Sequence, residues 1–134
     1  MTMRRLRGER GSVLVGGLLL TLALLLCVGT SVDLGRVLIA RRELIAQADQ
    51  AALSGAQQID LAALHQGRLT LDPGAARETA AQTLAGEHLT ARIEASGESV
   101  QVRLRRTLVT VFLPLLGIRT LTIAAAATAS PRQP

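Results

Sequence analysis

An uncharged, leucine-rich run near the N-terminus constrains this chain more than any other feature. The run extends from Ser12 to Val32, 21 residues, and contains eight leucines. As an α-helix that rises 1.5 Å per residue it would be roughly 30 Å long, which matches the hydrocarbon core of a bilayer. Because backbone polar groups inside lipid must be satisfied within the segment, the run predicts one transmembrane helix over residues 12–32.

The charges on either side of this run predict its orientation. Glu9 is the one acid before it, among four arginines, Arg4, Arg5, Arg7 and Arg10, whereas charges of both signs follow it from Asp33 onward. The positive-inside rule therefore places residues 1–11 in the cytoplasm and the rest of the chain outside the cell membrane. A cleaved signal peptide is the competing interpretation. The run is long for one and no A-x-A cleavage site follows it, so an uncut anchor is favoured.

The helical pattern continues past the membrane. No proline interrupts residues 12–56, and apolar or small residues recur at helical spacing. We therefore predict one continuous helix of about 45 residues, with an extracytoplasmic extension over residues 33–56. Its stripe is a candidate helix-packing surface, made of Val37, Leu38, Arg41, Leu44, Ile45, Ala48, Ala51 and Ala52. For Asp33, which interrupts the stripe, local pairing with Arg36 is favoured over pairing with a neighbouring subunit.

A linker and a short helix follow. Residues 57–74 are predicted to be a linker with one short turn. Asp72 before Pro73 is a helix start, with a side-chain acceptor at the N-cap and proline at the first helical position. The helix is expected over residues 75–88, with its inward face formed by Ala76, Ala80, Thr83 and Leu84.

From residue 91 the apolar period becomes two, which predicts strands. Strands are expected over 91–95, from Val100 onward, and over 120–128, with a turn at Gly97-Glu98 and an apolar turn over 113–117. Arg106 falls where an apolar residue is due, so a β-bulge is predicted near residues 105–107. The fold class is α+β and membrane-anchored: a long N-terminal helix, then a small helix and a three-stranded antiparallel sheet over residues 75–130, and a tail over 131–134.

The composition argues against several functions. The net charge is +5, but the chain has one aromatic residue with which to stack bases, so no nucleic-acid partner is predicted. His65 and His88 are far apart and the carboxylates are dispersed, which predicts no metal, cofactor or small-molecule site and no enzyme activity. The lone cysteine, Cys27, excludes an intrachain disulfide.

Two stretches of the chain resemble a known family. The first is Arg7-Gly8-Glu9-Arg10-Gly11-Ser12-Val13 with the leucine-rich span, Val32-Asp33-Leu34-Gly35-Arg36, and the helix from Ala46 to Ala56. The second is Val111-Phe112-Leu113-Pro114-Leu115-Leu116-Gly117-Ile118 with the Thr/Ala-rich strand after it. Together they are similar to TadE/TadG-like proteins of the Flp, or tight-adherence, pilus assembly systems.

This resemblance implies a minor-pilin-like or pseudopilin-like component of a pilus or secretion assembly. Its implied partners are membrane lipid and other subunits, bound by helix packing. TadE-like members are cut after a glycine and carry Glu at the fifth mature position. A cut between Gly11 and Ser12 would place Gly16 there, so the uncut TadG-like branch fits better. The alternatives are a stand-alone single-pass binding protein and a secreted protein.

Overall fold

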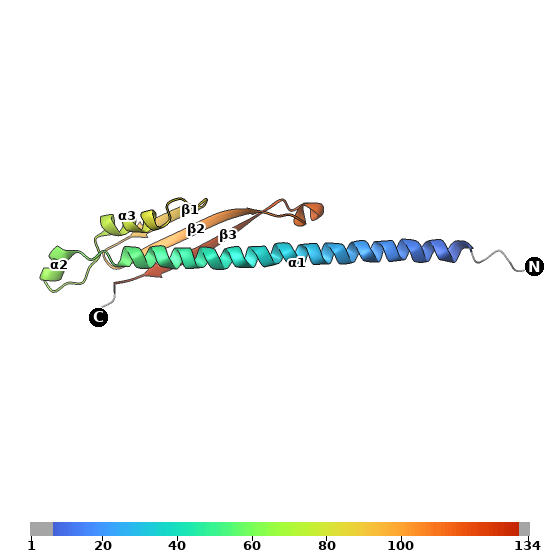
Figure 1. The fold of residues 1–134 in the computed structure, drawn as a ribbon. Helices are drawn as coiled ribbons and strands as arrows, with labels where there is room; N and C mark the ends of the chain where they lie inside the picture. Colours follow the sequence, from blue (N-terminus) through green and yellow to red (C-terminus); the bar gives the residue numbers. More distant parts are fainter. Residues whose placement is uncertain (1–6, 132–134) are drawn as a thin grey trace, which may run out of the picture. The chain divides into compact units, whose positions relative to one another are not determined.

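The computed structural model describes residues 7–131, with side chains described from residue 11. Residues 1–6 of the predicted cytoplasmic segment and 132–134 of the predicted tail lie outside the described residues. The chain divides into two compact units, whose helices and strands are labelled in Figure 1. The first, called here the anchor unit, contains residues 7–36 and 110–119; the second, called the head, contains residues 37–109 and 120–131.

Helix α1 runs from Arg7 to Ala56, 50 residues, and confirms the prediction of one continuous helix. Its sequence is rich in leucine and alanine and contains no proline, which favours uninterrupted helix. Residues 7–36 of α1 belong to the anchor unit and residues 37–56 to the head.

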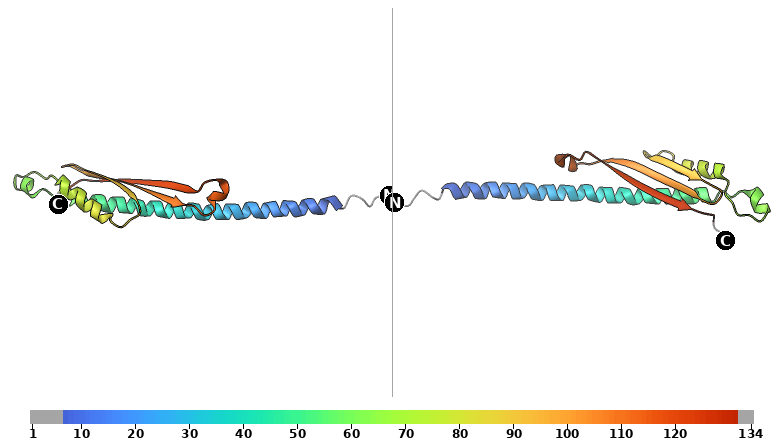
Figure 2. Two further views of the ribbon diagram at one scale, coloured as in Figure 1. Left: turned by 90° about the horizontal axis from the view of Figure 1, so that it is seen from above. Right: turned by 180° about the vertical axis from the view of Figure 1, so that it is seen from behind.

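The head contains a three-stranded antiparallel sheet, as predicted (Figure 2), and its strand order is β1-β2-β3. The strands are β1 (Thr90–Ala95), β2 (Val100–Val109) and β3 (Thr120–Ala129). Alternate residues of β2 lie on one face, where Val100, Val102 and Leu104 are fully buried. The other face carries polar and charged side chains, such as Arg92 and Arg103, which both lie within 4 Å of Glu94.

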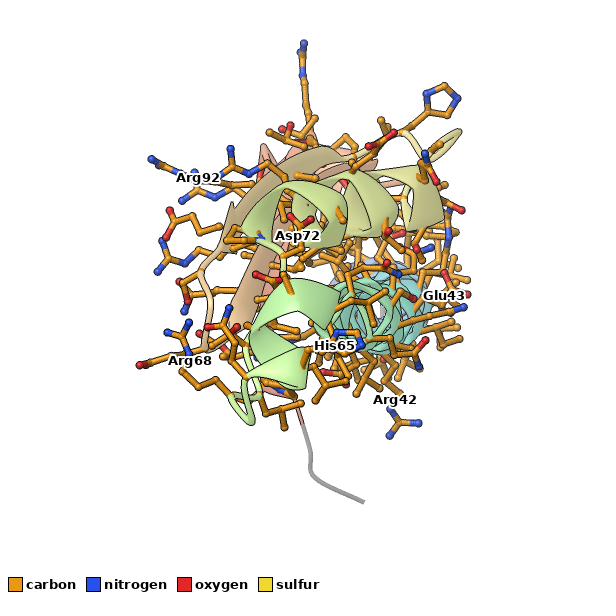
Figure 3. The ribbon with its side chains drawn as sticks, turned by 90° about the vertical axis from the view of Figure 1, so that its left-hand side faces the viewer. Arg42, Glu43, His65, Arg68, Asp72 and Arg92 are labelled. Carbon is orange, nitrogen blue, oxygen red and sulfur yellow. The ribbon has the colours of Figure 1, made fainter. Side chains whose placement is uncertain are left out.

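Two helical segments cover the apolar face of the sheet. Figure 3 shows α3 and α1 on the same side of the strands, with Arg42 and Arg92 extending away from the head in different directions. The core that forms between them is aliphatic, because Phe112, the sole aromatic residue of the sequence, belongs to the anchor unit. Its buried members are Leu44, Ala48, Ala51, Ala52, Leu71, Ala76, Ala80, Leu84, Val100, Val102, Leu104, Ile123 and Ala127.

Helix α3 (Pro73–Thr83) begins as predicted, since the Asp72 side chain accepts hydrogen bonds from the backbone N–H groups of Gly74 and Ala75. The prediction was wrong about its end. The helix stops at Thr83, not near His88, and Gly86 has φ +89°, a conformation that glycine adopts without steric cost. Thr83 is exposed rather than inward-facing.

The predicted bulge near residues 105–107 is also wrong. The β2–β3 register passes through this stretch without interruption, pairing Arg105 with Ala124, Arg106 with Ile123 and Thr107 with Thr122. Arg106 therefore lies on the core face, at the position that the alternation gives to an apolar residue.

The linker is more ordered than its composition suggests. It contains the short helix α2 (Leu61–His65), whose N-cap Asp60 accepts hydrogen bonds from the N–H groups of Ala62 and Ala63. A bridge between Ile59 and Leu71 closes the segment, and Leu71 is buried in the core at 2% exposure.

Candidate membrane and assembly surface

The leucine-rich part of α1 presents its side chains to the outside of the chain. In the most apolar 18-residue stretch of this helix only 6% is buried. The side chains of Val13, Leu14 and Leu18 are each about 70% exposed or more. A core helix of a soluble domain would instead be largely covered. This segment is long and apolar enough to cross a membrane, and its exposed side chains need lipid or another helix around them.

Asp33, the first charged residue after this segment, is buried within the anchor unit at 2% exposure. Its carboxylate accepts hydrogen bonds from three consecutive backbone N–H groups: Phe112 at 2.7 Å, Leu113 at 2.9 Å, and Val111 at 3.1 Å to each oxygen. The predicted pairing with Arg36 is therefore secondary, because the main partners lie about 80 residues further along the chain.

These N–H groups need an acceptor because a short helix begins beside them. The 3₁₀ helix η1 (Leu113–Leu116) starts after Phe112, whose side chain makes no capping hydrogen bond. The donors at a helix start have no acceptor within the helix itself. Asp33 supplies a carboxylate to them from α1, a site that anions favour.

Opposing effects act on the pKa of Asp33. Burial of the carboxyl group raises its pKa, but the hydrogen bonds from Leu113, Phe112 and Val111, together with the positive charge of Arg36, outweigh burial and hold the pKa below its usual value. Asp33 is therefore charged at neutral pH.

The segment that Asp33 holds, residues 110–119, is called here the apolar loop. Within it Thr110 donates its hydroxyl to the carbonyl of Ile118 at 2.7 Å, and Gly117, at φ +88°, closes η1. Phe112 packs so close to α1 that a Cβ on Gly29 would lie 2.5 Å from its ring. Sequence reasoning found this loop as an apolar turn but missed its link to Asp33. The available signals were an acid directly after the span and a proline-started turn without a capping residue.

The candidate packing stripe of α1 divides into two parts in the head. Leu44, Ala48, Ala51 and Ala52 are buried in the chain's own core, and Val37 packs partly against it. The expectation that the four buried residues face a neighbouring subunit is wrong, because the sheet and α3 already cover them.

Leu38, Arg41 and Ile45 lie beside the buried residues, along one border of the stripe, and are exposed. Leu38 is 53% exposed and Ile45 41%, and their spacing with Arg41 places them on one helical face. The candidate processing residues Gly11 and Ser12 are both exposed within α1. These positions stay candidates for an assembly surface and a cleavage site.

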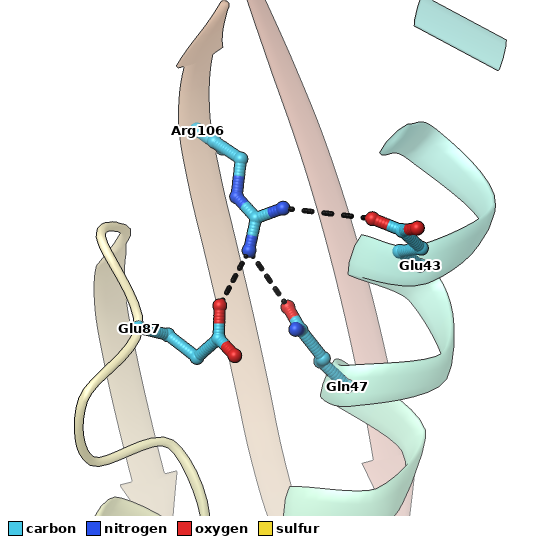
Figure 4. A network of polar contacts seen from close by, with 4 residues as sticks. All are labelled: Glu43, Gln47, Glu87 and Arg106. Atoms are coloured by element: carbon cyan, nitrogen blue, oxygen red, sulfur yellow. Dashed lines mark hydrogen bonds and ion pairs between the residues drawn. The ribbon is translucent and has the colours of Figure 1, made fainter. Parts of the chain in front are cut away.

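Arg106 is held by polar partners at the edge of the core (Figure 4). Its Nη2 donates to Glu87 Oε2 at 2.8 Å and to Gln47 Oε1 at 3.3 Å, while Nη1 lies 3.8 Å from Glu43 Oε2. The arginine side chain is only 17% exposed. The network joins β2, α1 and the segment after α3, which is a structural role.

The described residues do not suggest a catalytic or metal centre. Among residues 7–131 no three His, Cys, Asp or Glu side chains come together as metal ligands would. Arg106 and its partners are an ion-pair network without a nucleophile.

Comparisons with known proteins match two family models. The family described as "Putative Flp pilus-assembly TadE/G-like" matches residues 11–58, and the family described as "Putative Tad-like Flp pilus-assembly" matches residues 35–129. Comparisons with curated proteins and with solved structures gave no match.

Proposed function

Because the chain belongs to the Tad family of Flp pilus-assembly proteins, we propose that it is a minor-pilin-like structural component of a Flp-type pilus or secretion assembly. Family membership indicates a role related to Flp pilus assembly, and together with the apolar helix it indicates membrane anchoring. The proposed role is structural rather than enzymatic.

The observation that carries the proposal is the exposed face of α1 beyond the apolar segment. Leu38 and Ile45 are apolar, exposed and seven residues, or two helical turns, apart, and they border the buried stripe of the same helix. An apolar stripe on a helix gains free energy when another helix covers it. We therefore assign the contact with neighbouring subunits to Leu38, Arg41 and Ile45.

We also propose an uncut anchor with a cytoplasmic N-terminus and an extracytoplasmic head. The support is the excess of arginine before the span and Gly16 where processed TadE-like proteins carry Glu. N-terminal sequencing of the protein purified from membranes tests this. An intact start supports the anchor, a start at Ser12 indicates prepilin processing, and a start near Val32 indicates secretion.

Site-specific photo-crosslinking tests the assembly contact. A photoreactive amino acid at position 38 or 45 is expected to form light-dependent adducts with other pilus subunits in cells that carry the assembly genes. Leu44 is unsuitable for such a test, because its replacement would disturb the core. The matched control is position 77 on α3, where Arg77 is also exposed.

Adducts from position 77 at the same yield, or none from 38 and 45, would contradict the proposed surface. Adducts that persist when the assembly genes are deleted would favour the stand-alone membrane-anchored protein.

A further inference from the structure

The apolar loop exposes several large apolar side chains, which is unusual for a turn that faces water. Leu115 is 71% exposed, Leu116 60%, Val111 58%, Ile118 44% and Phe112 37%. Five large apolar side chains are thus exposed within eight residues, a concentration of the kind that marks a protein or membrane contact.

Backbone N–H groups of this loop have acceptors within the protein, as a segment in contact with lipid requires. Asp33 accepts the N–H groups of Val111, Phe112 and Leu113, and Pro114 has none. Three further N–H groups donate inside the loop: Leu115 to Phe112, Gly117 to Pro114 and Ile118 to Leu113, at 3.0–3.1 Å. A water-facing loop has no need of this, whereas in lipid every unsatisfied backbone group is costly.

The contacts of the loop place it beside the end of the apolar segment of α1. Phe112 lies against Gly29, which is inside the predicted span of residues 12–32, and the Asp33 hydrogen bonds lie one turn further along. The surface of the loop therefore continues the lipid-facing surface of α1 at the level where the span ends. Arg36 and Arg119 are exposed in the same unit, and arginines at this level suit lipid phosphates.

We propose that the apolar loop is a second membrane contact, which inserts Leu115, Leu116 and their apolar neighbours into the outer lipid interface while Asp33 satisfies its backbone. The proposal rests on the membrane anchor of the proposed function and adds a lipid-binding surface from the other end of the sequence. It also explains the buried Asp33: because its carboxylate accepts three backbone N–H groups, this irregular segment can contact lipid without leaving those groups unpaired.

A single tryptophan tests the proposal in the full chain, because the sequence contains neither tryptophan nor tyrosine. The Leu116→Trp chain is reconstituted into phosphatidylethanolamine–phosphatidylglycerol vesicles with and without brominated acyl chains. We expect blue-shifted emission, quenching by the brominated lipid, and iodide quenching severalfold weaker than that of N-acetyltryptophanamide. Leu61→Trp is the matched control: Leu61 is similarly exposed, at 66%, but has no link to Asp33, and iodide should reach it.

Leu22→Trp, in the middle of the span, separates the two proposals. If position 22 is quenched by brominated lipid and position 116 is open to iodide, the anchor stands and the lipid contact of the loop is refuted. If position 116 is shielded from both quenchers, protein covers the loop and the lipid assignment is again wrong. If position 22 is also unquenched, the anchor itself fails and both proposals fall. Adding Asp33→Ala to Leu116→Trp is expected to abolish the lipid quenching; unchanged quenching would remove Asp33 from the explanation.

Discussion

Leu44→Ala is the sharpest test of how the head is built. Leu44 is fully buried, in a core that contains no aromatic residue. The substitution removes three carbon atoms, equivalent to three CH2 groups at about 0.8 kcal/mol each, or roughly 2.4 kcal/mol of transfer free energy. The cavity left between α1 and β2 raises the expected loss in the free energy of unfolding to about 3–4 kcal/mol, within the range of measured Leu→Ala substitutions in protein cores.

Hydrogen exchange of the β2 amides is the suitable assay, since the head has no intrinsic fluorophore. For amides that exchange by opening of the whole head, a loss of 3–4 kcal/mol lowers protection by roughly 100- to 1,000-fold. The matched control is Leu38→Ala, the same chemical change on the same helix at a side chain that is 53% exposed. It should change the free energy of unfolding by no more than about 0.5 kcal/mol. Equal losses in the two variants, or a loss below about 1 kcal/mol for Leu44→Ala, would refute this assignment of the core.

Three further perturbations test other parts of the fold. Gly55→Ala should destabilise the head by about 1–3 kcal/mol in chemical denaturation despite its gain in helix propensity, because the new Cβ would lie 2.9 Å from the Ala76 carbonyl oxygen. Gly35→Ala is the control, since nothing lies within 4 Å of its Cβ and no such loss should occur. Arg106→Ala should lower the free energy of unfolding by about 1–3 kcal/mol, whereas Arg106→Met, which keeps the buried stem, should cost less; equal losses would show that the charge, not the stem, matters. Because the folded pKa of Asp33 is lowered, its stabilisation of the apolar loop should be complete above the usual carboxyl range near about 4 and lost as pH falls through the folded pKa. The protection factor of the loop amides is the ratio of the intrinsic to the observed exchange rate at each pH. A protection factor that stays constant through that range would contradict this.

Local signals in the sequence predicted the elements well. The proline-free run gave α1, Asp72 and Pro73 gave the start of α3, and the period of two gave the strands. Each of these features depends on residues close together in the chain, so spacing alone reports it.

Features that depend on distant partners were missed. The alternation predicts a bulge at Arg106 and not a buried arginine, because its partners Glu87 and Gln47 lie 19 and 59 residues away and sequence spacing does not bring them near. Asp33 was given a local partner for the same reason. In both cases a charged side chain sits where the pattern demands an apolar one, and long-range hydrogen bonds satisfy it.

The packing stripe shows a different limit of sequence reasoning. Its periodicity correctly indicated that one face of α1 is buried, but periodicity does not identify the covering surface. The small side chains favour the chain's own sheet: alanines at 48, 51 and 52, with Gly55 close to the Ala76 carbonyl oxygen, let α1 approach α3 and β2 closely. Larger side chains there would hold the helix away from the sheet and open cavities in a core without aromatic residues to fill them. The larger residues Leu38 and Ile45 lie beside this stripe and stay exposed, so the proposed assembly contact would not draw on the buried core of the head.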